Sequence, residues 1–566
     1  METASTQDDL LELIPWERVT LRQKQFQVVK KRNPLYRLTR EPASLEDFDW
    51  KKRLRAVAIW RENGTLIWIR NDDEDFETFE TKSLTHNPDK HIRLSFLYLK
   101  TTTSVSALIF GENDAAIAET FTFLCSLKHV TSGRVANLDP KLSINSMLHF
   151  KIAALQPEQL ARVLDSNPNR FLEIRAGFWT ADQSVVLATR PYSLKLWMQF
   201  YFQVSKQVGF LDGGAAFVDA LQKRKSRFGT LYLEFYSCDL PYCLVFSNFS
   251  LKRLLELEDK IELLSIRDIN DDMALRPLSA KVETLYYSFG AARLQIRDLC
   301  SVDIMPRKLH LDLRLEDTEE WHALPIAFLD RVAVSGRLER LVLTMHSYRK
   351  RKYKDESLIA KALSRVIRAN QQLEHLQVKS NVNWTRHVKG IFEAMENHPK
   401  LRTFAANIIA GKTLNYTCLE RLLSRNRNVS VFDEEGHRRI TNGTTIDALY
   451  SFNRFFHGSA AVVKESPSFR PRLITVTLTE SALGDFRRTA LLLSDHADAL
   501  CELLDCSGAV SAVAAKHATE EVAHALSLSE SCQTETLKRK AVTPLSPAAT
   551  KAGRIRPKVC NFFRYQ

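Results

Sequence analysis

Apolar residues recur every 28 residues in three segments that align without gaps: 363–378, 391–406 and 419–434. In each segment the first half carries apolar residues at helical spacing, and the second half approaches L-x-x-L-x-L, typical of a short strand with one buried face. A helix and a strand in so few residues cannot bury their own apolar faces. We therefore expect the units to stack, with parallel strands inside and helices outside. The matching positions are Leu363, Ile391 and Leu419; Ile367, Met395 and Leu423; Leu373, Leu401 and Val429; and Leu376, Phe404 and Phe432.

An asparagine lies near the helix-to-strand junction of each segment: Asn370, Asn397 and Asn426. Asparagine tolerates the left-handed backbone conformation that ends many helices. This tolerance is the explanation that the sequence offers for its recurrence.

The same pattern extends towards the N-terminus with less regular spacing. Residues 161–176 have the same order of helix, asparagine and strand, and 191–200 contain another candidate strand. The residues between Ser347 and Asp355 look like an insertion, so we count nine or ten units across about 140–440. The remaining candidate strands are centred on Leu338/Leu341/Leu343, Leu309/Leu311/Leu313, Val282/Leu285/Tyr287, Ile261/Leu264/Ile266 and Phe228/Leu231/Leu233.

The unit resembles the ribonuclease-inhibitor-like class of leucine-rich repeats, whose strand carries L-x-x-L-x-L-x-x-N/C. Leu373, Leu376 and Asn381 match that signature, and Val378 matches in apolar character, whereas Gly290 and Ile409 depart from it. The resemblance implies an α/β solenoid over 140–440. The alternative is a plain α/β sheet in which the spacing is a coincidence.

A β-rich module is expected over 45–130, after an N-terminal segment, 1–44. Residues 55–70 predict two strands and a tight turn, and 93–100 and 104–110 predict further strands. Asp114–Leu127 predicts a helix with Asn113 as its N-cap. This order is similar to that of a pleckstrin-homology domain, although the tryptophan usual in its last helix is absent. The alternative is an irregular N-terminal cap of the solenoid.

A mainly helical C-terminal cap is expected over 441–528. Residues 446–458 and 487–506 predict amphipathic helices, and 472–478 predict a strand. The order is similar to the C-terminal cap of a large, uncharacterised family of diatom leucine-rich-repeat proteins, with Phe469 where that family usually has tryptophan. The last segment, 529–566, is polar and basic, which predicts a disordered tail.

The net charge of +13 is unevenly spread, and the tail alone contributes +6, from eight Lys and Arg against two Glu. Lys538, Arg539 and Lys540 are a candidate nuclear import signal, the alternative being the ordinary charge of a disordered tail. No run of 18 apolar residues occurs, so no membrane span is expected. The acidic N-terminus does not resemble a signal peptide. We therefore expect a cytoplasmic or nuclear protein whose nine cysteines are reduced.

The sequence carries no recognisable catalytic or cofactor-binding motif. Neither GxxxxGK[ST] nor GxGxxG occurs, and GxSxG, HExxH and the kinase motifs are also absent. No cysteine or histidine pair has zinc-ligand spacing. We therefore expect a chain that is not an enzyme, with no cofactor and no metal.

The exposed residues of the strands then become the candidate site, because in a curved solenoid they project together from the concave face. In this reading His310, Arg340 and His375 are the first exposed positions of their strands. The prediction is a non-catalytic protein-binding scaffold or recognition subunit. The alternative is a nuclear or nucleic-acid-associated regulator that uses its basic segments. The candidate protein-binding residues are Tyr286, His310, Asp312, Arg314, Arg340, His375 and Lys379.

Overall fold

The computed structural model divides into two compact units, Met1–Phe456 and His457–Gln566. The division falls inside the helix Thr445–Val462, within the segment 441–528 that the sequence predicts as a C-terminal cap. The structure describes residues 10–26, 34–48, 56–71, 90–97, 104–128, 141–148, 150–175, 177–199, 208–234, 245–267, 269, 273–290, 296–315, 322–347, 356–409, 416–464, 469–482, 484–498 and 501.

A long parallel sheet runs through the first unit and confirms the expected α/β class. Each strand pairs in parallel with the next, in the order β7-β8-β10-β12-β13-β14-β15-β16-β17-β18-β19. The strands are β7 (Lys141–Leu148), β8 (Phe171–Ile174), β10 (Leu194–Gln199), β12 (Gly229–Glu234), β13 (Leu263–Arg267), β14 (Thr284–Gly290), β15 (Lys308–Leu315), β16 (Arg340–Ser347), β17 (His375–Ser380), β18 (Thr403–Ala406) and β19 (Ser430–Phe432).

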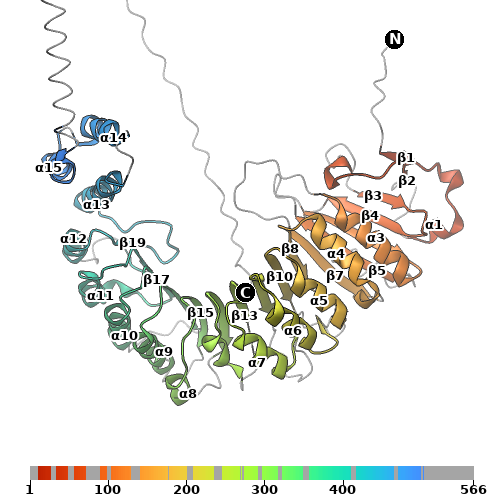
Figure 1. Ribbon diagram of the computed structural model, residues 1–566, viewed down its shortest axis with the longest axis horizontal. Helices are drawn as coiled ribbons and strands as arrows, with labels where there is room; N and C mark the ends of the chain where they lie inside the picture. Colours follow the sequence, from red (N-terminus) through yellow and green to blue (C-terminus); the bar gives the residue numbers. More distant parts are fainter. Residues whose placement is uncertain are drawn as a thin grey trace, which may run out of the picture. The chain divides into compact units, whose positions relative to one another are not determined.

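Helices connect these strands and lie on one side of the sheet, the outer side of its curve (Figure 1). A separate two-stranded sheet, β9 (Gly177–Trp179) with β11 (Val208–Phe210), was not predicted. The helices are α4 (Pro157–Ser166), α5 (Ala181–Thr189), α6 (Ala215–Lys223), α7 (Asn248–Glu256), α8 (Ile296–Cys300), α9 (Ala323–Ser335), α10 (Glu356–Ala369), α11 (Val388–Met395) and α12 (Tyr416–Arg425), with short 3-10 turns η3 (Ile152–Ala154), η5 (Arg276–Ser279) and η6 (Trp384–Arg386).

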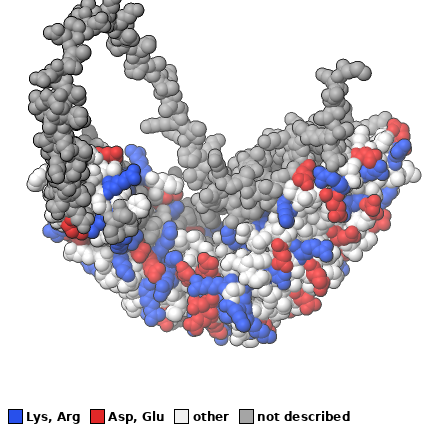
Figure 2. Space-filling model, turned by 45° about the horizontal axis from the view of Figure 1, so that its top comes forward, with Lys and Arg blue, Asp and Glu red and all other residues white. Residues whose placement is uncertain are grey.

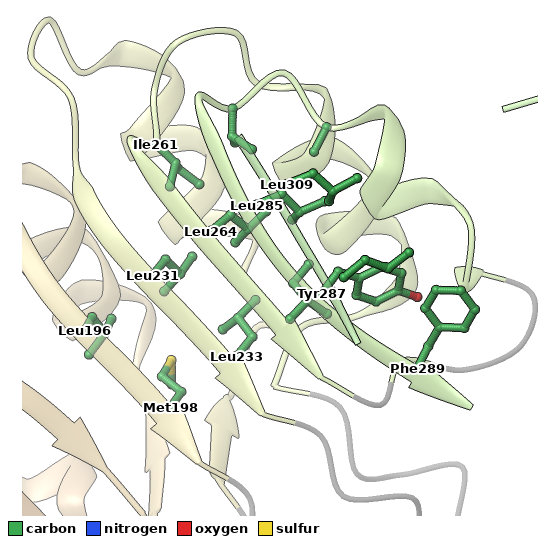
Figure 3. Packing of buried hydrophobic residues seen from close by; sticks show 14 of the residues in the cluster. Leu196, Met198, Leu231, Leu233, Ile261, Leu264, Leu285, Tyr287, Phe289 and Leu309 are labelled. Atoms are coloured by element: carbon green, nitrogen blue, oxygen red, sulfur yellow. The ribbon is translucent and has the colours of Figure 1, made fainter. Parts of the chain in front are cut away.

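The core lies between the sheet and these helices. Equivalent leucines of successive strands, such as Leu231, Leu264 and Leu285, are fully buried and stack beside one another (Figure 3). Alternate residues of each strand point to the opposite face, which none of these helices covers. Stacked leucines therefore hold neighbouring units together and fix the register of the open face.

The 28-residue alignment holds for two of the three segments and fails by one residue in the third. Leu376 pairs with Phe404, as expected, and both are fully buried. Phe404, however, pairs with Val431, and it is Val431 that is fully buried. The prediction for Phe432 was wrong because the connection after Asn426 is one residue shorter than its counterparts, so the side chain faces the other way.

The junction asparagines act through their side chains, not through a left-handed backbone. Among the described residues other than glycine, only Asp259 has a positive φ. Asn426 is buried, and its Nδ2 donates to the carbonyls of Met395 and His398, at 2.7 and 3.0 Å. Asn370 is likewise buried and donates to the Val332 carbonyl at 3.2 Å. Each side chain therefore satisfies a carbonyl at the end of the preceding helix.

The middle member of this series is His398, not Asn397. Asn397 is exposed, whereas His398 is buried, and its Nε2 lies 2.9 Å from the Asn370 carbonyl oxygen. His398 is 28 residues from both Asn370 and Asn426. Asn381, which completes the L-x-x-L-x-L-x-x-N match, is exposed.

In the N-terminal half, buried arginines donate hydrogen bonds to such carbonyls. Arg170 donates to the Cys125 carbonyl at 2.6 Å, at the end of α3 (Asp114–Ser126). Arg224, also buried, donates to the carbonyls of Ala188 and Tyr192, at 2.8 and 2.7 Å. Asparagine, histidine and arginine thus fill one structural role along the sheet.

The N-terminal strands continue the long sheet. β5 pairs antiparallel with β7, and the ladder then runs β5-β6-β4-β3-β2-β1. The expected helix is present as α3, and Asn113 caps it by accepting from Ala116 N at 2.8 Å. The strands are β1 (Leu11–Leu13), β2 (Leu35–Leu38), β3 (Ala56–Trp60), β4 (Leu66–Asn71), β5 (Lys90–Leu97) and β6 (Ser104–Gly111), with α1 (Leu21–Gln25), η1 (Trp16–Arg18) and η2 (Leu45–Phe48).

This continuity bears on the pleckstrin-homology resemblance. Among the described residues the strands of 45–130 form no closed barrel of their own, because β5 uses its free edge to pair with β7. The arrangement favours the alternative, an N-terminal end of the long sheet.

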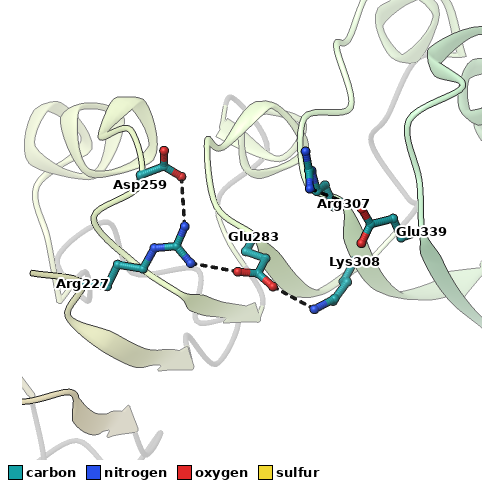
Figure 4. A network of polar contacts seen from close by, with 6 residues as sticks. All are labelled: Arg227, Asp259, Glu283, Arg307, Lys308 and Glu339. Atoms are coloured by element: carbon teal, nitrogen blue, oxygen red, sulfur yellow. Dashed lines mark hydrogen bonds and ion pairs between the residues drawn. The ribbon is translucent and has the colours of Figure 1, made fainter. Parts of the chain in front are cut away.

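Ion pairs line the edge where the strands begin (Figure 4). Glu283 accepts from both Arg227 and Lys308, at 2.9 and 2.8 Å. Arg307 pairs with Glu339 at 3.4 Å, and Arg227 also lies 3.5 Å from Asp259. At this edge the cations are therefore matched by carboxylates of neighbouring units.

The second unit is helical in its described part. It holds the end of α13 (Thr445–Val462), α14 (Arg470–Thr477), the π-helical turn η7 (Leu478–Ala482) and α15 (Phe486–Asp495). The strand expected at 472–478 is wrong, since α14 spans Arg470–Thr477 with Pro471 in its first turn. Thr475 and Thr477 donate to carbonyls four residues earlier. Within the described parts of the chain, no helix is both long and apolar enough to cross a bilayer.

Candidate binding surface on the open face

Three rows of side chains cross the open face of the sheet at right angles to the strands. The first row is Thr284, Lys308, Arg340 and His375; the second is Tyr232, Ser265, Tyr286, His310, Val342 and Gln377; the third is Glu234, Arg267, Ser288, Asp312, Thr344 and Lys379. The expected placement of His310 beside Arg340 in the first row was wrong. Lys308 occupies that position because β15 begins at Lys308, two residues earlier than the first exposed position that the sequence analysis assumed.

Two rings of the second row form a stacked pair. The Tyr286 and His310 ring centroids are 4.0 Å apart, and the rings are inclined by 18°. Both side chains are half-buried. Burial lowers the pKa of His310 to about 3, and the positive charge of Arg340 contributes in the same direction. The imidazole is therefore neutral at physiological pH and presents a flat, uncharged surface with its tyrosine neighbour.

Arg340 and His375 lie next to this pair in the first row. Burial, followed by the charge of Arg340, lowers the pKa of His375 to about 4. The Nε2 atom of His375 is buried and has no hydrogen-bond partner among the described residues. Arg340 is exposed and forms no ion pair with any residue that the structure describes. An unpaired guanidinium thus lies beside two uncharged imidazoles.

The third row is polar, and its charged groups have partners within the chain. Ser288 Oγ donates to Asp312 Oδ2 at 3.1 Å, and His346 Nε2 lies 3.5 Å from Asp312 Oδ1. Burial raises the pKa of Asp312. Arg267 pairs with the buried Glu234 at 2.5 Å. Asp312 therefore lies close to the Tyr286–His310 pair, but its hydrogen bonds are directed within the row.

Lys379 forms an ion pair with a turn that covers one end of the open face. Residues 433–439 follow β19 and fold back over β17 (Figure 1). Gln377 Nε2 donates to the Glu434 carbonyl at 2.6 Å, and Lys379 Nζ pairs with Glu435 at 3.2 Å. Arg314 lies farther along its strand, opposite His346. The structure therefore brings together Tyr286, His310, Arg340 and His375, with Asp312 beside them, and leaves Arg314 and Lys379 at the margin.

The sequence reading missed an aromatic cluster at the other end of the same face. Phe171, Trp197 and Tyr232 lie with ring centroids 5.8–6.3 Å apart. Lys141 Nζ lies 4.9 Å from the Trp197 ring and pairs with the buried Glu173 at 3.1 Å. Strand alternation would have found Trp197, because it stands between the buried residues of β10.

Charges of both signs are interspersed over the visible surface (Figure 2). The basic run at Lys223–Arg227 is largely structural: Arg224 is a buried tie between units, and Arg227 pairs with Glu283 and Asp259. This run therefore offers fewer free cations than its sequence suggests.

A serine and a histidine meet in the second unit without the geometry of an activated nucleophile. Ser459 Oγ lies 3.1 Å from Nε2 of the fully buried His496. Arg470 Nη2 lies 3.2 Å from His496 Nδ1, and a guanidinium can only donate. The proton of a neutral His496 therefore stays on Nε2, which also contacts the Ser459 carbonyl at 3.0 Å, so the ring cannot accept the Ser459 proton.

Other candidate features fall outside this surface. The described residues contain no group of three or more His, Cys, Asp or Glu arranged to hold a metal. Lys538, Arg539 and Lys540 lie outside the described residues. No family model and no curated protein matches the chain.

Proposed function

We propose that this chain is a leucine-rich-repeat scaffold of the ribonuclease-inhibitor-like kind, and that it binds a partner protein through the open face of its sheet without catalysing a reaction. The observation that carries the proposal is the Tyr286–His310 stack beside the unpaired Arg340. Tyrosine and arginine are the residue types that most often anchor protein interfaces. A pair of rings already fixed by stacking loses little conformational entropy on binding.

The rest of the open face supports this assignment. Around the centre, charged groups such as Lys379 and Arg267 are neutralised by partners within the chain. A rim of satisfied polar groups around a few exposed anchors is typical of interfaces that bind protein. The aromatic cluster at Trp197 gives the same face a second apolar area.

The alternative is binding of nucleic acid through basic segments in a nuclear protein. Of those segments, 30–32, 349–354 and the tail lie outside the described residues, and the run at 223–227 is engaged within the fold. Salt separates the two functions. Phosphate contacts weaken steeply between low and physiological salt, whereas a mixed-charge protein interface weakens much less.

The test is capture of partners by the immobilised full chain from a lysate of its source cells, followed by mass spectrometry. The double variant Tyr286→Ala/Arg340→Glu should lose a specific partner by about tenfold or more, because it removes both anchors. The control, Leu358→Ala/Lys361→Glu, makes the same kinds of change, a truncation to alanine and a charge reversal, at exposed positions on α10, outside the open face.

Capture that both double variants retain in full, with unchanged far-UV circular dichroism, would contradict binding through the open face. A nuclease-sensitive capture that disappears at moderate salt would instead support the nucleic-acid alternative.

A further inference from the structure

The charge of Arg340 is left unbalanced in a region where other cations are balanced. In its row, Lys308 pairs with Glu283, and the flanking Arg267 and Lys379 pair with Glu234 and Glu435. Arg340 is exposed and has no such pair among the described residues. The two nearest histidines are uncharged at neutral pH, so they do not add to its charge.

The surroundings of Arg340 favour one carboxylate over a chain of phosphates. A guanidinium offers two parallel N–H donors that match a carboxylate. A nucleic acid backbone carries a charge on every residue and needs several free cations in a row. On this face the other cations of the three rows, Lys308, Arg267 and Lys379, are already paired with carboxylates, so they offer no run of free cations to a phosphate backbone.

We propose that the open face binds an acidic segment of a partner protein, with the Arg340 guanidinium pairing with an Asp or Glu side chain and the Tyr286–His310 pair packing against a neighbouring apolar residue. This inference rests on the proposed function and specifies the chemistry of its partner.

The spacing of the strands limits the sequence of that segment. Neighbouring strands are about 4.8 Å apart, so the centre of the Tyr286–His310 pair lies roughly 7–10 Å from Arg340. An extended chain advances about 3.3 Å per residue. The acidic and apolar residues of the partner should therefore be separated by two or three positions.

The experiment measures binding of short extended peptides to the purified full chain. A display library selects peptides, and each selected acidic residue is then replaced by its amide, Asp→Asn or Glu→Gln. The acidic form should bind about tenfold or more tightly than the amide. The Arg340→Gln variant should remove that preference, so that the double-mutant cycle shows coupling between the two groups. Arg340→Lys should restore it only in part, because an ammonium cannot bind a carboxylate in the bidentate manner.

Arg307→Gln is the matched control, since Arg307 is an exposed arginine immediately before β15 that already pairs with Glu339. It should leave the preference intact. Peptides that bind through Tyr286 with equal affinity in acidic and amide forms would overturn the carboxylate pairing and leave the binding face in place. A library that yields no binder to the folded chain would also overturn it, while the capture experiment would still decide the proposed function. If a single-stranded oligonucleotide binds more tightly than the selected peptides, and Arg340→Gln abolishes that binding, the site would be one for nucleic acid and the peptide proposal would be overturned.

Discussion

The imidazole of His310 lies flat against the phenol ring of Tyr286, with centroids 4.0 Å apart, on neighbouring strands of a parallel sheet. Neither strand alone creates this pair. It arises because β14 and β15 are in register at these two positions, and the register is set by the buried leucines behind them. The surface chemistry of the open face is therefore a product of core packing on the other side.

Leu376→Asp should unfold the parallel sheet. Leu376 is fully buried between β16 and β18, so an aspartate there would place an unpaired charge inside the core. We expect the free energy of unfolding to fall by about 4 kcal/mol or more. Thermal melting followed by circular dichroism measures the change. Lys389→Asp, at an exposed position of α11, should melt close to the parent, and a Leu376→Asp protein that also does so would contradict this core.

Asn426→Ala should destabilise the chain, whereas Asn397→Ala should not. The first substitution leaves the carbonyls of Met395 and His398 buried without their donor, at a cost of about 1–3 kcal/mol. The second removes an exposed side chain. Chemical denaturation of the two variants gives the comparison. Equal midpoints would mean that the junction residues do not tie neighbouring units.

Acid should weaken the fold through His310. Its pKa is about 3 in the folded chain and about 6.5 in an unfolded one, so below pH 6.5 the unfolded chain takes up a proton that the folded chain does not. Stability is then lost progressively as the pH falls from 6.5 towards 3, by at most about 2 kcal/mol at pH 5. His310→Phe, which keeps an aromatic ring and cannot titrate, should reduce this loss. His437→Phe, at an exposed position, should leave it unchanged; a parent-like profile in both variants would contradict the burial of His310.

Glu173→Gln should destabilise the N-terminal part of the sheet. Glu173 is fully buried and pairs with Lys141 and Arg175, at 3.1 and 3.0 Å, so the amide would leave two partly buried cations without a counter-charge. We expect a loss of about 3 kcal/mol. The same change at the exposed Glu262 is the control, and equal unfolding free energies for the two variants would rule out the cost that we assign to this cluster.

The sequence predicted the helices and strands well where apolar periodicity is strong. The units at Leu363, Ile391 and Leu419 fold into the expected helix–strand order, and Asn113 caps its helix as expected. The failures have local causes. A connection one residue shorter moved Val431 into the place given to Phe432, and backbone propensity alone could not separate a helix from a strand at 472–478.

The residues that share the open face were predicted in part. Strand alternation identified Tyr286, His310, Arg340 and His375, because the exposed face follows from the buried one. Which of these residues lie side by side depends on where each strand begins. For β15 the sequence analysis placed this start two residues too late. Lys379 and Glu435 are 56 positions apart in the sequence, and no local sequence pattern predicts a contact over that separation.

The turn at 433–439 limits what the open face can accept. Because it folds over β17 and holds Gln377 and Lys379, an extended ligand that crosses the strands from β10 meets a barrier after β16. If the proposed acidic segment binds, its acidic residue would pair with Arg340 on β16, next to the covered strand, and the rest of the segment could extend only towards β10. Deletion of the turn would uncover β17. A ligand of the same composition could then bind at several positions along the face.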